Sequence, residues 1–307
     1  MKKRIKYLLA GGVALSMLTM ISCEDEKSLP KIDGYNNSDE VASANLLANW
    51  TFDGTNAEDI SGAVPLAGAA GTFGTVGFET GQIGQALKLT QGALRYPNIT
   101  ALNTANALAN FTVSMWVKVN NNKGTAAEGY TMLFGLFPDG LTANTVGDFM
   151  WGNVNMAVET GWFPPSAAPD TLVLKGHFVI KNEDGSISGQ DNRPDPKGGQ
   201  GVFKHTGEWV HFVCRWNAST HQLNIFGNAT SIGNWNDRGT TGALRMNVPC
   251  SPVFGNGATK AVGFTNNPDQ QSWSPMATAS IDDVRVYNTA LTDAEITALF
   301  NLGSAGR

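Results

Sequence analysis

The sequence has little of what enzymes and nucleic-acid-binding proteins need. Only 15% of the 307 residues are charged, acidic residues outnumber basic ones by 26 to 21, and there are four histidines. No H-E-x-x-H zinc pattern or G-x-S-x-G hydrolase turn occurs, and the glycine-rich loop KGGQG lacks the Lys-Ser/Thr pair of a phosphate-binding loop. An acidic chain has no electrostatic footprint for nucleic acid. We therefore expect neither an enzyme nor a nucleic-acid partner.

Long apolar runs are also scarce, and the clearest one lies near the N-terminus. It extends from Tyr7 to Ile21 after the basic start MKKRIK, which is shorter than the roughly 20 residues that span a bilayer. Because the run ends in MISC, residues 1–23 resemble a bacterial lipoprotein signal peptide, whose cleavage would leave Cys23 as a lipidated N-terminus. An uncleaved short anchor or ordinary secretion is the alternative.

The residues after Cys23 bear on location. EDEKS resembles the surface-export signals of Bacteroidetes lipoproteins, although a solvated linker has the same composition. We expect a protein that is lipid-anchored in the outer membrane, faces the cell exterior and contacts the membrane through its lipid alone. Residues 24–42 are polar and show no periodicity, so we predict a flexible tether there and a domain over residues 43–307.

Cleavage would make the chain more acidic. Residues 1–23 contain four of the 21 basic residues and no acidic ones, so the formal net charge would fall from −5 to −9. Neutral partners such as glycans or peptides, and cations, suit such a surface.

Alternating sequences recur from Leu46 onward. Apolar and polar residues alternate in FTVSMWVKV, EWVHFVCRW and HQLNIFG, and turns rich in Gly, Asn and Pro separate such runs. This pattern is typical of short antiparallel strands that bury one face, as in a sandwich. His211 falls on the face opposite Phe212 and Cys214, so we expect it at the surface of the sheet.

One helix is clearly indicated, close to the C-terminus, in LTDAEITALF. Thr292 is a suitable N-cap, and Glu295 three residues later completes a capping box. Leu291 and Ile296 can form a hydrophobic staple, and Gly303 is expected to end the helix.

The strand before this helix contains an acid in an unexpected place. In SIDDVRVY, Asp282 is in phase with Val284 and Val286, which mark a core face. A carboxylate cannot lie uncompensated in a dry core. We therefore expect an inward-facing Asp282 that meets a cation, a base or several backbone N–H groups.

Several stretches, in this order, resemble the LamG-like (concanavalin A-like) jelly-roll domains of bacterial surface proteins. They are LLANWTFDGTNAEDISG, GQIGQALKL, FTVSMWVKV, GEWVHFVCRWNASTHQLNIFGN and SIDDVRVYNTALTDAEITALF. The resemblance implies an all-β, two-sheet antiparallel jelly-roll sandwich with a short C-terminal helix. The chain departs from the family after Lys123, where its insertions are longer. The E-x-D-x-x-E run of related glycosidases is missing, and Glu159, Glu183 and Glu208 are isolated.

The same resemblance implies a structural calcium site, because related domains often bind calcium near the first turn and the last strand. The matching residues are Asp53, Asp59, Asp282 and Asp283. Carboxylates and carbonyls are the oxygen ligands that calcium prefers. The alternative is that these acids hold the N-terminal loop by hydrogen bonds or pair with Arg285 or Arg95.

Tryptophans are the best candidates for ligand binding, since aromatic rings stack on the apolar faces of sugars. Four of the eight lie in strand-like patterns and are expected to be structural: Trp50, Trp116, Trp209 and Trp216. The predicted ligand-binding residues lie in loop-like, polar surroundings and are Trp151, Trp162, Trp235, Asn236, Asp237, Arg238 and Trp273. The alternative is that each ring only packs a loop against the sandwich.

Two cysteines remain beside Cys23. Export would permit a disulfide between Cys214 and Cys250, and two buried thiols are the alternative. Together these features predict a non-catalytic, surface-exposed lipoprotein that binds a glycan or another neutral nutrient polymer. The alternative function is an accessory or structural subunit of an outer-membrane transporter complex for nutrients, SusCD-like by the resemblance of its lipoprotein type.

Overall fold

The computed structural model describes residues 29–120, 129–138, 152–159, 171–181, 187–193, 202–204, 206–235 and 248–307. Two predicted elements lie at the ends of this part: β1 (Leu46–Trp50) and α2 (Asp293–Ser304). Between them are β2 (Thr72–Thr80), β3 (Gln85–Arg95), α1 (Thr100–Asn103), β4 (Phe111–Val119), β5 (Tyr130–Pro138), β6 (Val154–Glu159), β7 (Thr171–Lys181), β8 (Ile187–Arg193), β9 (Val202–Lys204), β10 (Trp209–Asn217), β11 (Gln222–Gly227), β12 (Thr230–Trp235), β13 (Cys250–Phe254) and β14 (Ala277–Tyr287).

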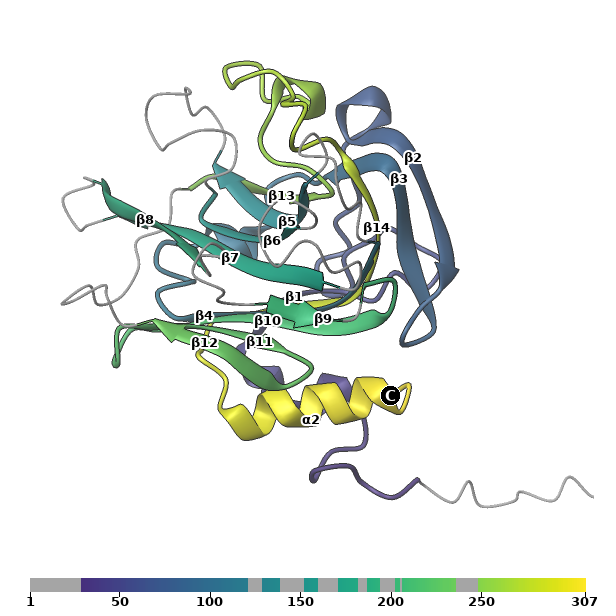
Figure 1. Ribbon diagram of the computed structural model, residues 1–307, viewed down its shortest axis with the longest axis vertical. Helices are drawn as coiled ribbons and strands as arrows, with labels where there is room; N and C mark the ends of the chain where they lie inside the picture. Colours follow the sequence, from purple (N-terminus) through teal and green to yellow (C-terminus); the bar gives the residue numbers. More distant parts are fainter. Residues whose placement is uncertain are drawn as a thin grey trace, which may run out of the picture. The chain divides into compact units, whose positions relative to one another are not determined.

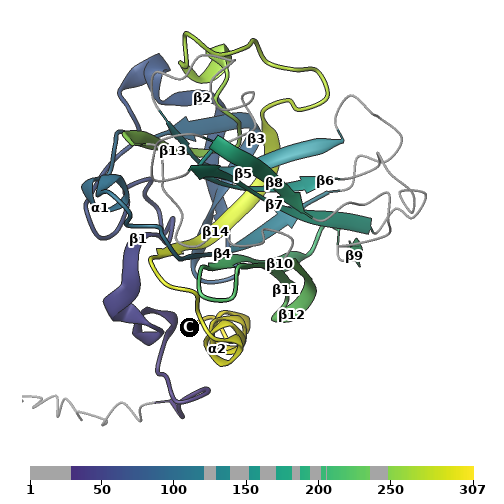
Figure 2. The ribbon, with the colours of Figure 1, turned by 90° about the vertical axis from the view of Figure 1, so that its left-hand side faces the viewer.

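The strands form one curled antiparallel sheet, which confirms the predicted all-β class. Their order is β12-β11-β10-β4-β14-β3-β13-β5-β6-β7-β8, with β1 beside β14, β2 beside β3 and β9 beside β7. Because the sheet folds over on itself, strands β5–β8 pass across β4 and β10 as a second layer (Figures 1 and 2). The two layers are thus halves of one continuous sheet.

The core lies between the two layers. A side chain at Gly176 of β7 would run into Cys214 and Ile225 of the opposite layer, so the backbones pack closely there. At the other end of the core, Trp50 meets Phe254 edge-on, with ring centroids 5.2 Å apart. Aromatic pairs in this geometry add stabilisation beyond the apolar area that they bury.

Strand β14 contains a β-bulge, which corrects the predicted position of Asp282. Asp282 lies opposite Trp116 and Arg285 lies opposite Ser114, so β14 has one more residue than β4 between these two pairs. The extra residue, Asp283, has a φ of 46°, a left-handed conformation common at bulges.

The bulge changes the direction of the side chains that follow it. Ile281 and Val284 both point into the core, although they are three residues apart. Asp282 therefore lies on the outer face of the sheet with Trp116, and not among the core valines. The prediction of an inward-facing acid was wrong because it assumed unbroken alternation.

Helix α2 covers this outer face, as Figure 1 shows. Its capping box is present as predicted, with Glu295 N donating to Thr292 Oγ1 and Thr292 N donating to the Glu295 carboxylate at 2.7 Å. The helix continues through Gly303, which was expected to end it. Gly303 lies against the ring of Trp116, where a Cβ would overlap the indole.

His211 is buried under this helix, contrary to the prediction of a surface position. It is 1% exposed and packs against both Trp116 and Phe300, with the Trp116 and His211 ring centroids 5.1 Å apart. Its Nε2 lies 2.8 Å from Ser114 Oγ. Burial and the charge of Arg285 lower the pKa of His211 to about 3, so the ring is neutral at physiological pH.

The segment before β1 packs against the same helix. Val41 is fully buried and contributes to an apolar cluster with Ile296 and Leu299, against which Ile32 and Tyr35 also pack. Residues 31–42, which we had expected to belong to a flexible tether, are therefore part of the compact unit that extends from Lys31 to Arg307.

Polar contacts join this segment to the C-terminal part of the chain. Asp39 forms an ion pair of 2.8 Å with Arg285, which is 3% exposed. Arg307 donates from its Nε to the carbonyl of Asn36 and accepts from Ser38 Oγ through its own carbonyl. Breaking the pair would leave a buried guanidinium with one counter-charge fewer, which is costly.

A chain that begins at residue 43 should consequently be less stable than one that begins at residue 30. The loss of Val41 alone should cost roughly 1.5–3 kcal/mol of unfolding free energy. Urea denaturation of the two chains measures the difference. Equal stabilities would contradict the packing of residues 31–42.

Candidate functional site

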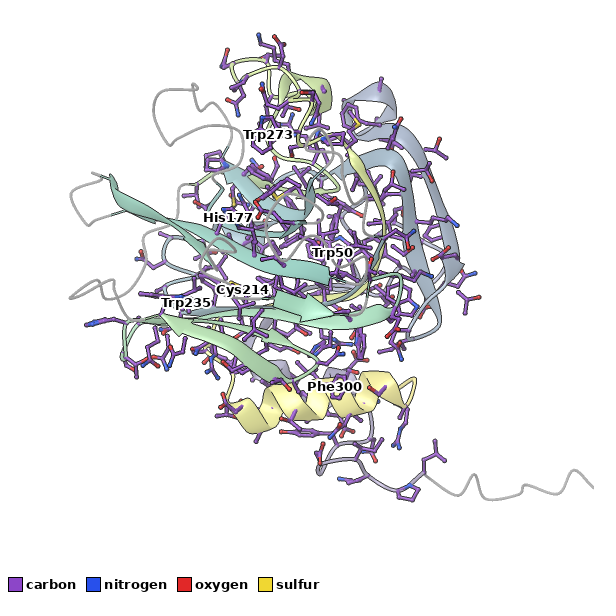
Figure 3. All side chains as sticks on the ribbon, viewed as in Figure 1. Trp50, His177, Cys214, Trp235, Trp273 and Phe300 are labelled. Carbon is purple, nitrogen blue, oxygen red and sulfur yellow. The ribbon has the colours of Figure 1, made fainter. Side chains whose placement is uncertain are left out.

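Most of the predicted ligand-binding residues lie outside the described residues. They are Trp151, Trp162, Asn236, Asp237 and Arg238, and the predicted lipidation site Cys23 lies outside as well. Of the predicted ligand-binding residues, Trp235 and Trp273 are described. Trp273 packs against the cluster of Tyr130 and Phe137 and Trp235 against the main core cluster, and Figure 3 shows them well apart, Trp273 near the top and Trp235 at the lower left. They therefore do not belong to one binding surface.

Trp235 packs against the sandwich. It is partly buried at the end of β12, beside the core cluster. Its ring lies over Gly233, where a Cβ would overlap the indole. In this position the ring packs on the edge strand of the sheet. This packing matches the structural alternative given for the loop tryptophans in the sequence analysis.

Trp273 has a different environment, at the tip of a tight turn. Ser274 N donates to the carbonyl of Gln271 at 3.1 Å, so Ser272 and Trp273 form the tip, and Trp273 is partly exposed. The Tyr130 ring of β5 meets the indole nearly at right angles, with centroids 5.9 Å apart. The turn and this contact together fix the orientation of the indole.

The 255–276 segment that carries this turn is held by side-chain amides. Asn256 Nδ2 donates to Gln270 Oε1 at 2.6 Å, and Gln270 Nε2 donates to the carbonyl of Ser274. Asn267 Nδ2 donates to the carbonyl of Ala258 at 2.8 Å. Because these amides bind backbone on both sides of the turn, Trp273 belongs to an ordered loop.

Beside Trp273, the outer face of β5–β7 carries polar side chains. Val154, Met156 and Val158 of β6 point into the core, so Asn155 and Glu159 point outward. The pairing partners on β7 alternate in the same way, which places Lys175 and His177 on this face. Sequence reasoning missed this row, although the alternation in VNMAVE and TLVLKGH could have indicated it.

Two polar pairs organise this face. Lys175 Nζ lies 3.2 Å from Glu159 Oε1, and Tyr130 Oη lies 2.6 Å from His177 Nε2. Burial, with the nearby charge of Lys175, holds the pKa of His177 well below its ordinary value. His177 is therefore neutral at physiological pH. Because β5–β7 contain a single carboxylate, Glu159, these strands alone cannot supply the two carboxyl groups of a retaining glycosidase.

The acids predicted to bind calcium hold the turn between β2 and β3. Asp282 Oδ2 accepts from Gln82 N at 2.8 Å and from Ile83 N at 2.9 Å, and Asp53 Oδ1 accepts from Gln85 N at 2.6 Å. Gly84, with a φ of 55°, lies so close to Asp53 that a Cβ would overlap the carboxylate. This turn thus connects the opening loop of the domain to its closing strand.

The other two acids have separate partners. Asp59 accepts from Thr51 N at 2.7 Å, and Asp283 accepts from Arg285 through both of its oxygens. Within the described ranges, no three Asp, Glu, His or Cys side chains are grouped as metal ligands. The four predicted acids thus do not converge there, and calcium binding stays a prediction of the family resemblance.

The sequence analysis also missed Glu58, the most deeply buried acid of the opening loop. Glu58 is fully buried, and its carboxylate accepts from Asn49 N at 2.7 Å and Ile60 N at 3.2 Å. The N–H and hydroxyl of Ser61 also donate to it. Four donors compensate the burial of one charge, so this loop is ordered.

Cys214 and Cys250 are both buried thiols in the structure, on β10 and β13, and no disulfide joins them.

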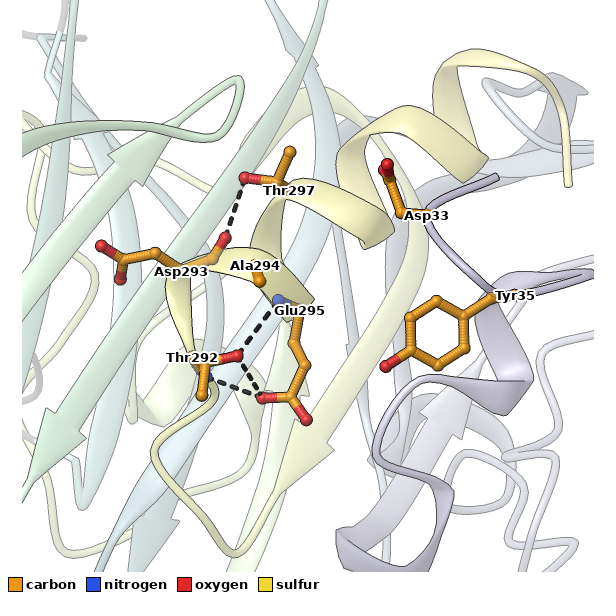
Figure 4. A pocket seen from close by; sticks show the side chains of 7 residues that line it. All are labelled: Asp33, Tyr35, Thr292, Asp293, Ala294, Glu295 and Thr297. Atoms are coloured by element: carbon orange, nitrogen blue, oxygen red, sulfur yellow. Dashed lines mark hydrogen bonds between the residues drawn. The ribbon is translucent and has the colours of Figure 1, made fainter. Parts of the chain in front are cut away.

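A pocket of about 620 Å³ lies between the N-terminal segment and the start of α2 (Figure 4). Three acids line it, but each has another contact. Asp293 pairs with Arg215 at 2.7 Å, Glu295 is in the capping box, and Asp33 accepts from Asn301 at 2.7 Å. The acids of this pocket therefore contribute to the packing of α2.

No protein-family model matches the sequence, and no curated protein matches it. Among solved structures, it is similar to domain 4 of an extracellular arabinanase from Geobacillus stearothermophilus, in complex with arabinotriose. The identity is 19% and the TM-score 0.50, over 83% of this chain and 98% of that domain.

Toxin binding domains are similar at lower identity. The botulinum neurotoxin serotype G binding domain is 10% identical, with a TM-score of 0.53 over 84% of this chain and 51% of that one. The binding domain of Paraclostridial mosquitocidal protein 1 is 13% identical, with a TM-score of 0.50, over 84% and 52%. This chain thus spans about half the length of these two domains. Such similarities show the β-sandwich fold.

Among the helices of the described part, none is long and apolar enough to cross a membrane.

The burial of Asp282 leads to a pH-dependent stability. Burial, together with the charge of Asp283, raises its pKa to about 7, although the N–H bonds from Ile83 and Gln82 offset part of the shift. Between about pH 4 and pH 7 the folded chain keeps a proton that the unfolded chain has lost. Unfolding free energy should therefore fall as pH rises through this window, by at most about 1.4 kcal/mol per pH unit.

Asp282→Asn, which keeps an acceptor oxygen, should lose this dependence. Urea denaturation of both proteins at pH 5 and pH 8, with and without a chelator, measures it. A bound calcium ion would favour the ionised carboxylate, so wild-type stability would then rise with pH and fall with the chelator. Identical pH slopes in the wild type and the variant would contradict the role of Asp282.

Proposed function

We propose that this protein is a non-catalytic carbohydrate-binding domain whose ligand contacts Trp273. The observation that carries the proposal is the fixed, partly exposed Trp273 indole at the tip of the 271–274 turn. The Tyr130 ring packs edge-on against this indole. A rigid aromatic ring can stack on the apolar face of a sugar at low entropic cost. Exposed Ser272 and partly exposed Gln271 beside it offer hydrogen-bonding groups for hydroxyls.

The neighbouring sheet face supports the same proposal. Lys175, Glu159 and the Tyr130–His177 pair form a polar layer next to the indole. Each group already has a partner there, so the layer is suited to holding the position of Trp273. The similar arabinanase domain was solved in complex with arabinotriose, which makes a sugar the first ligand class to test.

Replacing Trp273 with Ala should abolish glycan binding or weaken it at least tenfold. Phe78→Ala is the matched control, because Phe78 is an aromatic residue on β2 that is 38% exposed and lies outside this surface. A glycan array of chains that begin at residue 30 identifies a ligand, and titration calorimetry compares the variants. Equal weakening by both substitutions, or undiminished binding by the Trp273 variant, would refute the site.

The lipid anchor belongs to the same proposal. The MISC sequence and the basic, apolar start of the chain support lipidation of Cys23, with the domain held at the outer membrane and facing the exterior. Cys23→Ser should therefore shift the protein from the membrane fraction to the soluble fraction of cells. Retention of the variant in the membrane fraction would argue for an uncleaved anchor.

A second candidate function is that of an accessory subunit of an outer-membrane nutrient transporter. Ile60 and Val64 are 54% and 58% exposed on the loop that Glu58 orders, and exposed apolar side chains on an ordered loop suit a protein contact. No binding on the glycan array, together with co-purification of a membrane transporter, would favour this function.

A further inference from the structure

A row of side chains crosses the outer face of the sheet, beside the Trp116–His211 pair that α2 covers. Trp209 of β10 is paired with Lys118 of β4, Lys118 with Ser280 of β14, and Ser280 with Lys88 of β3. Directly paired residues point to the same face. Because neighbouring strands are about 4.8 Å apart, the row from Trp209 to Lys88 is about 14 Å long. We name these residues, together with Glu79, the Lys88–Trp209 row.

Glu79 of β2 holds the polar members of the row in place. Its carboxylate accepts from Lys118 Nζ at 2.6 Å, from Ser280 Oγ at 2.6 Å and from Lys88 Nζ at 2.8 Å. Partial burial acts to raise the pKa of Glu79, but these donors lower it to about 2, so the carboxylate stays charged at physiological pH.

The residues of the row carry one net positive charge, because two lysines share a single glutamate. Lys118 Nζ lies 4.9 Å from the centre of the Trp209 ring, so this ammonium group is shared between ring and carboxylate. Lys88 is the accessible cation, with 53% of its side chain exposed. This local positive charge lies on a chain whose formal net charge is −5.

The surface beside the row is open and rich in hydroxyls. A side chain at Gly77, the β2 partner of Lys88, would meet nothing within 4 Å. Thr75, Thr90 and Thr278 are exposed on the same strands. Trp209, expected from the sequence to be structural, is partly exposed at the other end of the row.

From this arrangement we propose a second binding site, distinct from Trp273, for an acidic oligosaccharide. A sugar carboxylate pairs with Lys88, the exposed part of the Trp209 ring contacts a sugar ring, and the threonines bind hydroxyls. The row spans three strand spacings of about 4.8 Å each. This length is close to that of two to three linked sugar units. The net positive charge of the row favours an acidic sugar over a neutral one.

Nucleic acid is a poorer match for the same groups. It carries one negative charge about every 1.7 Å of duplex, and its binding needs several lysines or arginines on one surface. A net charge of −5 repels such a densely charged polymer more strongly than a short oligosaccharide, which carries fewer charges.

Lys88→Gln tests the proposal, with Lys260→Gln as the matched control. Lys260 also pairs with an acid, Asp269, and its side chain is 50% exposed on the 255–276 segment. The probes are a trimer of galacturonic acid and its neutral counterpart, a trimer of galactose, measured by titration calorimetry with the full chain. We expect the acidic trimer to bind more tightly, and Lys88→Gln to weaken it at least tenfold while Lys260→Gln leaves it unchanged.

Other results would overturn the proposal. They are equal binding of both trimers, no binding of the acidic trimer, equal weakening by both lysine variants, or tighter binding of a single-stranded oligonucleotide than of the acidic trimer. Gly77→Trp keeps every charge and fills the open end of the row, so undiminished binding by this variant would also count against the site. Trp273→Ala should leave the acidic trimer bound, which separates this site from the one proposed above.

Discussion

The bulge at Asp282 and Asp283 is the constraint on which the arrangement of this domain depends. It lets Ile281 and Val284 both point into the core while Asp282 and Arg285 stay on the outer face. From there Asp282 holds the β2–β3 turn through two N–H groups, and Arg285 pairs with Asp39 of the N-terminal segment. One extra residue in β14 thus links the sheet to two segments that are distant in sequence.

Burial of the outer face follows from the same arrangement. Two-layer sandwiches commonly expose the outer faces of their sheets. Here α2 and residues 31–42 cover part of that face, so Trp116, His211 and Arg285 are buried there. The Lys88–Trp209 row lies beside this covered part, whereas the site proposed at Trp273 lies beside β5 in the other layer.

Local sequence patterns predicted the fold class, the positions of β4, β10, β11 and β14 and the capping box at Thr292, because these depend on period-two alternation and on contacts within one helical turn. The bulge was missed, although in SIDDVRVY the apolar Ile281 is out of phase with Val284 and Val286 and could have indicated an extra residue. Local patterns could not predict what covers a strand. His211 was expected at the surface because alternation gives the face on which a side chain lies, and not the helix that packs there.

The candidate sites were predictable only in part for a related reason. Composition pointed to the loop tryptophans, of which Trp273 is partly exposed and Trp235 packs against Gly233. The Lys88–Trp209 row is assembled from five strands that span the whole domain, so it exists only once the pairing register is known. Buried carboxylates such as Glu58 likewise differ from exposed ones through tertiary contacts alone.

The most direct test of carbohydrate binding is to follow the eight tryptophan indole N–H signals by nuclear magnetic resonance during titration with a glycan identified on the array. The Trp273 signal should shift in proportion to bound ligand, while the signals of buried Trp50 and Trp216 stay in place. An unchanged Trp273 signal at saturating glycan would contradict the account.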